Sequence, residues 1–203
     1  MKFLFISDLH IKKDSQPECT NWVAHFCKYI SEHSGSETLY VFVLGDVIDK
    51  GQADAFLTAD RFFSYIEEKV SPIKVEFVFL PGNHDYCNKG LSEFGAFCER
   101  HRGATTSVVD FIGRNTSHIE LDQINFILAD SMNGREHDMP GSLDIGGLYD
   151  VYVPGKTNVL LMHHHLLFED ESKNSGINNA KDVIETLRKL GINCVSRSYT
   201  LFE

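Results

Sequence analysis

The chain has 203 residues, of which 42% are hydrophobic and 24% charged, as is typical of a globular protein. At about 100–200 residues per domain, this length predicts one domain over residues 1–203. The 19 Lys and Arg against 29 Asp and Glu give a formal net charge of −10. That balance argues against non-specific binding to nucleic acid or to anionic membranes, which requires a basic face.

The five cysteines are scattered, odd in number and contain no Cys-x-x-Cys pair. This pattern argues against a disulfide framework or a thiolate zinc site and favours a reducing compartment. The apolar run at residues 3–6 is too short for a signal peptide, and the sequence has no 18-residue apolar run. We therefore expect a cytoplasmic protein that does not enter a membrane.

In the first half of the chain, short apolar runs alternate with segments of helical periodicity, which is the pattern of an α/β domain. Buried strands are predicted at residues 2–6, 38–44 and 74–80. Hydrophobic residues recur at helical spacing across residues 23–30, 55–70 and 94–98. We interpret each of these stripes as a face that packs on the sheet, rather than as a binding surface.

The pattern changes after residue 107. Short strands separated by hairpin-like turns are predicted at residues 108–111, 116–121 and 125–129. Residues 131–157 contain five glycines and two prolines, so we expect a long surface loop there. A buried strand at 158–162, a helix at 180–190 and an apolar stretch at 192–195 complete the chain.

Polar residues follow four of the predicted strands directly. Their motifs are Asp8-x-His10 after strand 2–6, Gly45-Asp46-x-x-Asp49 after strand 38–44, Gly82-Asn83-His84-Asp85 after strand 74–80 and His163-His164-His165 after strand 158–162. In an open parallel sheet the carboxyl ends of the strands lie along one edge, where ligand sites form. The sequence therefore predicts one site built from carboxylates, imidazoles and an amide.

Each motif also has an ordinary structural explanation when it is taken alone. Gly-Asn-His-Asp suits a turn, and at most one or two of three consecutive histidines can face one site. Glu99-Arg100-His101 has nearly the spacing of Asp8-x-His10 but lies on a predicted helix, so we assign it to the solvated surface. Gly155-Lys156-Thr157 lacks the upstream glycine of a phosphate-binding loop, which would fall at Asp150, and is interpreted as a turn. Four polar motifs that each follow an apolar strand favour a shared site over four coincidences.

In order and approximate spacing over residues 1–165, the four motifs resemble those of the calcineurin-like metallophosphoesterases. The resemblance implies an α/β fold, a four-layer α/β/β/α sandwich of two mixed sheets flanked by helices. It also implies two divalent or transition metal ions of the Mn, Fe or Zn type. The implied ligands are Asp8 and His10 for one ion, Asn83 and His163 for the other, and Asp46 as the bridge between them.

The resemblance also assigns roles around these ligands. His163 is preferred to His164 and His165 because the ligand of the family lies nearest the end of the strand. His84, oriented by Asp85, would be the acid beside the leaving group. The neighbouring carboxylate would favour the imidazolium form of His84.

The residue types fit this chemistry independently of the family resemblance. Carboxylate, imidazole and amide ligands without thiolate suit Mn²⁺, Fe or Zn²⁺. Two such ions about 3.5–4 Å apart can clamp a phosphate and acidify a water, and a positioned histidine can protonate the leaving alkoxide. Lys50 could add positive charge near the phosphate, although a solvated surface lysine explains it equally well.

The sequence departs from the family pattern near its C-terminal end. Members of the family carry a Gly-His-x-His motif after a further strand, whereas here residues 192–195 lead into Ser196-Arg197-Ser198-Tyr199. No histidine follows His165. We therefore expect a C-terminal part that is incomplete after about residue 195, as in a truncated gene product or a divergent copy with incomplete metal shells.

The leading functional prediction is a metal-dependent phosphoesterase that acts on phosphodiesters, of the cyclic-nucleotide or a related type. The triple histidine resembles that branch of the superfamily. Phosphomonoesters and nuclease-type substrates are alternatives within the same class. The alternative from another class is a non-catalytic regulatory or binding module that kept the fold and lost turnover. The expected partner is a phosphate ester, and the oligomeric state is not predicted.

Overall fold

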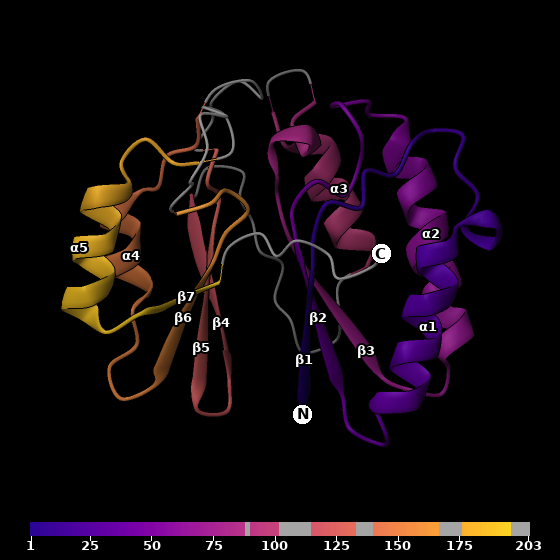
Figure 1. The fold of residues 1–203 in the computed structure, drawn as a ribbon, viewed down its shortest axis with the longest axis horizontal. Coiled ribbons are helices and arrows are strands. Elements are labelled where there is room, and N and C mark those ends of the chain that lie inside the picture. The colour runs from indigo at the N-terminus through magenta and orange to yellow at the C-terminus, as the bar shows by residue number, and fades with distance from the viewer. Residues whose placement is uncertain (88–89, 102–114, 133–139, 167–175, 196–203) are drawn as a thin grey trace.

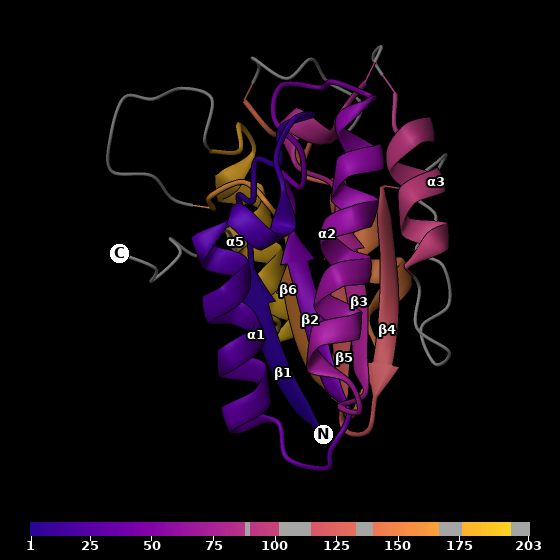
Figure 2. The same ribbon diagram turned by 90° about the vertical axis from the view of Figure 1, so that its right-hand side faces the viewer.

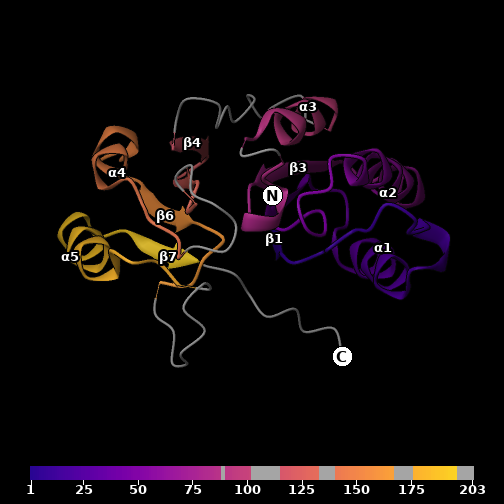
Figure 3. The ribbon, with the colours of Figure 1, turned by 90° about the horizontal axis from the view of Figure 1, so that it is seen from above.

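The computed structural model describes residues 1–87, 90–101, 115–132, 140–166 and 176–195. Two β-sheets face each other at the centre of the molecule, and helices cover the outer face of each sheet (Figures 1 and 3). The predicted four-layer α/β/β/α sandwich is therefore confirmed. The predicted strand at 108–111 lies outside the described residues.

The first sheet consists of β1 (Lys2–Ile6), β2 (Leu39–Leu44) and β3 (Val75–Leu80), in that order, and all its strands are parallel. It therefore differs from the expected mixed sheet. Its central strand β2 is buried at all six positions, as expected of a strand that is covered on both faces. The helices α1 (Asn21–His33), α2 (Ala55–Val70) and α3 (Ser92–Arg100) cover the outer face (Figure 2).

The second sheet has the order β4 (Thr116–Leu121), β5 (Ile124–Ala129), β6 (Thr157–Leu161) and β7 (Asn193–Val195). It is mixed, because β4 runs antiparallel to β5 whereas β6 and β7 continue parallel to it. Helices α4 (Ile145–Val151) and α5 (Ala180–Leu190) cover its outer face (Figure 1). No helix in the described ranges combines the length and the apolar character needed to span a bilayer.

Helix α4 lies inside the segment for which a long loop was expected, so that expectation is wrong for its residues. Asp144 caps the helix by accepting a hydrogen bond from the backbone N–H of Gly147. Leu148 and Val151, three residues apart, are buried against the second sheet. The two glycines at 146 and 147 hid this short amphipathic pattern, because glycine is a poor helix former.

The space between the sheets is filled largely by phenylalanine. The ring of Phe126 on β5 lies 4.6 Å from that of Phe42 on β2 and 5.0 Å from that of Phe3 on β1, measured between centroids. Side chains alternate along the strand, so the neighbouring Ile127 faces the other way, into a second cluster beneath α4 and α5. The second sheet therefore separates two hydrophobic clusters.

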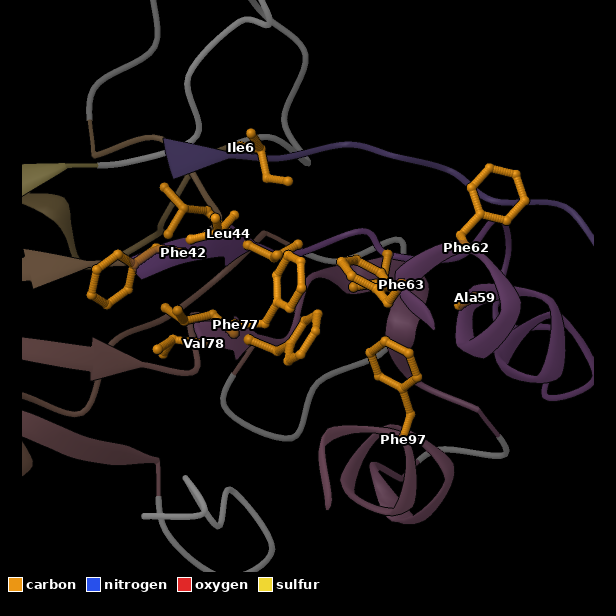
Figure 4. Close-up of a cluster of buried hydrophobic side chains, with 14 of the residues drawn as sticks. Ile6, Phe42, Leu44, Ala59, Phe62, Phe63, Phe77, Val78 and Phe97 are labelled. Carbon is orange, nitrogen blue, oxygen red and sulfur yellow. The ribbon is translucent and has the colours of Figure 1, made fainter. Parts of the chain in front are cut away.

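On the helix side of the first sheet, Phe63 of α2 and Phe97 of α3 meet the strands, while Phe42 points to the opposite side (Figure 4). His101 joins this aromatic cluster: it is buried, its ring centroid lies 5.1 Å from that of Phe97, and its Nε2 lies 3.1 Å from Oδ1 of Asp60. The assignment of residues 99–101 to the solvated surface is therefore wrong for His101. The residue follows the end of α3, so its ring can turn inward.

Two short 3-10 helices complete the described fold. The first, η1 (Pro17–Cys19), precedes α1, and the second, η2 (Asn83–Asp85), follows β3. The helix η2 carries part of the predicted metal site.

Candidate metal centre

The loops that follow β1 and β2 run side by side. The backbone N–H of Asp8 donates to the carbonyl of Gly45 (3.1 Å), and that of His10 donates to the carbonyl of Asp46 (3.0 Å). The parallel pairing of the strands thus continues beyond their ends. This pairing brings the first two predicted motifs together at the carboxyl edge of the sheet.

Two glycines allow the strand ends to approach each other closely. Gly45 has a φ of +87°, and a Cβ at this position would lie 2.6 Å from Nδ1 of His163. A Cβ on Gly82 would overlap the carboxylate of Asp46. A side chain at either position would therefore displace Asp46 or His163, so both glycines of the motifs serve the geometry of the site.

Three of the predicted ligands have left-handed backbone conformations. The φ angles are 60° for Asp8, 44° for His10 and 54° for Asp46. Such conformations are uncommon outside glycine and cost about 1–3 kcal/mol each. Strain of this kind persists where the surrounding structure imposes it, and it clusters at functional sites. Here it falls on residues that the sequence motifs had singled out for chemical reasons.

Asp46 lies at the centre of the cluster and is 1% exposed. Its Oδ1 accepts a hydrogen bond from the backbone N–H of His84 (2.9 Å). Its Oδ2 lies 3.4 Å from Nε2 of His163 and 3.8 Å from Nε2 of His10. One carboxylate oxygen therefore faces imidazoles from two different sheets.

His163 is supplied by the second sheet and is also 1% exposed. Its Nδ1 lies 2.8 Å from the carbonyl oxygen of Leu44, which can accept a hydrogen bond from the Nδ1–H group and so direct the other nitrogen into the cluster. That nitrogen, Nε2, lies 3.1 Å from Oδ1 of Asn83. His164 points elsewhere, with Nδ1 2.7 Å from Oγ of Ser131.

Asp46 and His163 favour each other's charged form. Burial by itself would raise the pKa of Asp46, but the hydrogen bond and charge of His163 lower it well below its usual range. Burial likewise opposes protonation of His163, and contact with Asp46 raises its pKa. The two side chains therefore form a buried ion pair, and both could bind one cation once Nε2 of His163 has lost its proton.

His84 lies at the edge of this cluster, with its ring 4.8 Å from that of His10. Its Nδ1 accepts a hydrogen bond from the backbone N–H of Lys50 (3.0 Å) and lies 3.6 Å from Oδ1 of Asp49. Because Nδ1 is an acceptor, the neutral ring carries its proton on Nε2. Burial lowers the pKa of His84, so its protonated form is scarcer and more acidic than that of a free histidine.

The structure corrects the role expected for Asp85, which does not orient His84. The two carboxylate oxygens of Asp85 accept backbone N–H groups from Ile48 (3.2 Å) and Gly82 (2.9 Å). Burial raises the pKa of Asp85 to about 7. Asp85 therefore ties the loop after β2 to the loop after β3, and the carboxylate nearest to the His84 ring is Asp49. The sequence contained Asp49 in its motif but gave it no task.

The side chains fit divalent cations. The ligand atoms of Asp8, His10 and Asp46 all lie within 4.8 Å of one another, and those of His10, Asp49 and His84 form a second such group. The buried Nδ1 of His10 has no hydrogen-bond partner among the described residues, so this atom is available to a cation. Carboxylates, imidazoles and an amide oxygen are the donors that borderline divalent metals prefer. The segment 196–199, where the family motif was missing, lies outside the described residues.

Comparison with known proteins identifies the class. The sequence matches the calcineurin-like phosphoesterase family over residues 1–196, and the chain therefore belongs to this family of metal-dependent phosphoesterases. The structure is similar to that of a dimetal phosphatase from Danio rerio, with a TM-score of 0.57 and 15% sequence identity. The similarity covers 96% of this chain and 86% of that chain, and it shows a shared fold. No curated protein matches the sequence significantly.

Proposed function

We propose that the protein hydrolyses phosphodiesters at a two-metal centre. Asp8 and His10 would hold one ion, Asn83 and His163 the other, and Asp46 would bridge both. The observation that carries this proposal is the position of Asp46 Oδ2, which lies within 4 Å of an imidazole nitrogen on either side. When bound, two cations would neutralise charge on the phosphate and lower the pKa of a water molecule.

The chain's own residues would carry the remaining steps. The oxygen of water forms a bond to phosphorus, the bond from phosphorus to the leaving oxygen breaks, and that oxygen needs a proton. His84 would donate this proton from Nε2 of its imidazolium form, in which Nδ1 also carries a proton and would face Asp49 instead of accepting the N–H of Lys50. Asp49, 3.6 Å from Nδ1, would stabilise the ring while it is charged.

The charges around the centre support a diester rather than a monoester. Asp8, Asp46 and Asp49 crowd the site with negative charge. A phosphodiester carries one negative charge near neutral pH, whereas a phosphomonoester carries nearly two. A phosphodiester is therefore repelled less by these carboxylates and needs fewer positively charged side chains to bind.

The direct test compares bis(p-nitrophenyl) phosphate with p-nitrophenyl phosphate after Mn²⁺ is added to the purified chain. We expect faster hydrolysis of the diester. Asp46→Asn should abolish turnover while leaving circular dichroism unchanged, because no neighbour can replace a bridging carboxylate. Asp54→Asn is the matched control: this exposed carboxylate pairs with Lys13 on the surface, and its loss should leave turnover intact. Full activity in Asp46→Asn would refute the assignment.

The second candidate is a binding module without turnover. The sequence has no histidine after His165, so the proposed ligands give each ion only three protein ligands when the bridge is counted twice. A chain that binds Mn²⁺ and a phosphodiester but hydrolyses neither substrate would favour this candidate. The same assay, run beside metal calorimetry, separates the two.

We also propose a reducing, cytoplasmic environment. The cysteines Cys19, Cys27, Cys87 and Cys98 are free in the described part of the chain, which supports this location.

A further inference from the structure

The two sheets are connected beside the candidate centre by a contact outside the proposed ligand set. The hydroxyl of Tyr86, the residue that follows η2, donates a hydrogen bond to Oδ2 of Asp130. Asp130 directly follows β5 in the second sheet and is 2% exposed. A buried carboxylate needs hydrogen-bond donors, and a charge-assisted bond of this kind is among the stronger ones.

Asp130 is itself held firmly. Its Oδ1 accepts the backbone N–H of Met132 (2.9 Å), and its own N–H donates to the carbonyl of Asn115 (2.9 Å). The carboxylate therefore presents Oδ2 to Tyr86 from a fixed position. Tyr86 in turn is three residues from Asn83, so η2 is attached to the end of β5 close to a proposed ligand.

The end of β5 is linked onward to the end of β6. Ser131 follows Asp130, and its Oγ lies 2.7 Å from Nδ1 of His164 and accepts the backbone N–H of the same residue (3.1 Å). His164 adjoins His163, whose Nε2 lies 3.1 Å from Oδ1 of Asn83. A continuous series of contacts therefore runs from Tyr86, next to η2, through the ends of β5 and β6 and back to Asn83 in η2.

We infer that Tyr86 is a positioning residue that sets the separation between Asn83 and His163. These two ligands come from different sheets, so their spacing depends on how the ends of the sheets are held together. The hydrogen bond from Tyr86 to Asp130 holds η2 against the second sheet at the strand ends where Asn83 and His163 lie. This inference rests on the metal centre of the proposed function and assigns Tyr86 no contact with substrate.

The test is the affinity of the full chain for Mn²⁺, measured by titration calorimetry. Tyr86→Phe should weaken binding of at least one ion on the order of 10-fold, the lower end of the range for lost outer partners of metal ligands. Tyr149→Phe is the matched control, because this tyrosine on α4 is 44% exposed and meets Lys189 through its ring, not its hydroxyl. Its dissociation constants should equal those of the wild type.

A second variant separates positioning from general destabilisation. Asp130→Asn keeps an oxygen that can accept the N–H of Met132 but weakens the bond from Tyr86. The double variant Tyr86→Phe/Asp130→Asn should bind Mn²⁺ no more weakly than the weaker single variant, because both changes remove the same interaction. If the decreases in Mn²⁺ affinity of the two single variants multiplied in the double variant, the two substitutions would act independently and the inference would be overturned.

The outcomes also separate this inference from the proposed function. Dissociation constants of Tyr86→Phe within about 2-fold of the wild type would overturn the inference, even if the melting temperature of the metal-free chain fell. A wild-type chain that binds Mn²⁺ but hydrolyses nothing would refute the proposed function, and the affinities would still decide the role of Tyr86. A wild-type chain that binds no Mn²⁺ overturns both.

Discussion

The two sheets contribute unequally to the candidate centre. The first, parallel throughout, brings the proposed ligands Asp8, His10, Asp46 and Asn83 to its carboxyl edge, whereas among the described residues the second brings one proposed ligand, His163. Every strand of a parallel sheet ends at the same edge. In the second sheet β4 runs the other way and ends at the opposite edge. Three strands of each sheet, β1–β3 and β5–β7, nevertheless run parallel, so the difference lies in the residues that follow the strands and not in strand direction alone.

The strand β7 sharpens this comparison. It lies parallel to β6, so the chain leaves it toward the same edge as His163. This is the place in the sequence where the family carries Gly-His-x-His and where this chain has Ser196-Arg197-Ser198. Within the described residues, β7 therefore ends at the edge of the sheet that carries His163.

The largest effect is expected at the edge of the first sheet. His84→Ala should slow turnover by about 10²–10⁴-fold, the usual range for a lost general acid, while Mn²⁺ affinity is retained. The loss should be smaller for a p-nitrophenyl leaving group than for an alkyl one, because p-nitrophenolate hardly needs a proton. His118→Ala, on β4 of the second sheet, should leave turnover unchanged. If His84→Ala lost its affinity for Mn²⁺ and slowed hydrolysis equally for both leaving groups, His84 would be a metal ligand and not the general acid.

An intermediate effect is expected where the sheets meet. Phe126→Ala removes a ring buried between them and should lower the free energy of unfolding by about 3–5 kcal/mol in urea denaturation. It should also weaken Mn²⁺ binding, because the spacing of the sheets sets the distance from His163 to Asn83. Leu187→Ala, on the far side of the second sheet, should cost about 2–5 kcal/mol without changing Mn²⁺ affinity. If Leu187→Ala weakened Mn²⁺ binding as much as Phe126→Ala does, packing in either hydrophobic cluster would affect the metal centre equally, and the distinction between the clusters would be wrong.

The smallest effect is expected at the opposite edge of the second sheet. Lys156 bonds to the carbonyl of Asp122 and pairs with Glu120 at the surface. Surface ion pairs of this kind contribute little, so Lys156→Ala should change the melting temperature by less than about 3 °C. Hydrolysis should be unaffected. A loss of turnover would revive the phosphate-loop interpretation of Gly155-Lys156-Thr157.

Much of this architecture could be predicted because its periodicity is strong. The predicted strands at 2–6 and 116–121 and the helices at 55–70 and 180–190 have the bounds found in the structure. The continuous apolar run of β2 likewise indicated a strand covered on both faces. The short helix α4 was missed because its two glycines interrupt the pattern.

The candidate site was predictable in composition but not in orientation. The rule for parallel strand ends placed Asp8, Asp46 and the histidines at 163–165 together before any geometry was known, and the family resemblance singled out His163. Consecutive residues of a tight turn point in different directions, so adjacency to His84 said nothing about where Asp85 would point. The contact of Tyr86 with Asp130 joins residues 44 positions apart, and no motif in the sequence pairs them.

The left-handed conformations of Asp8, His10 and Asp46 have an evolutionary consequence. Glycine at any of these positions would relieve backbone strain, so mutation under selection for stability alone would favour its appearance there. A lineage that no longer needed the chemistry is expected to lose these three side chains early. Glycine at Asp8, His10 or Asp46 is therefore expected to stabilise the fold while removing a candidate ligand.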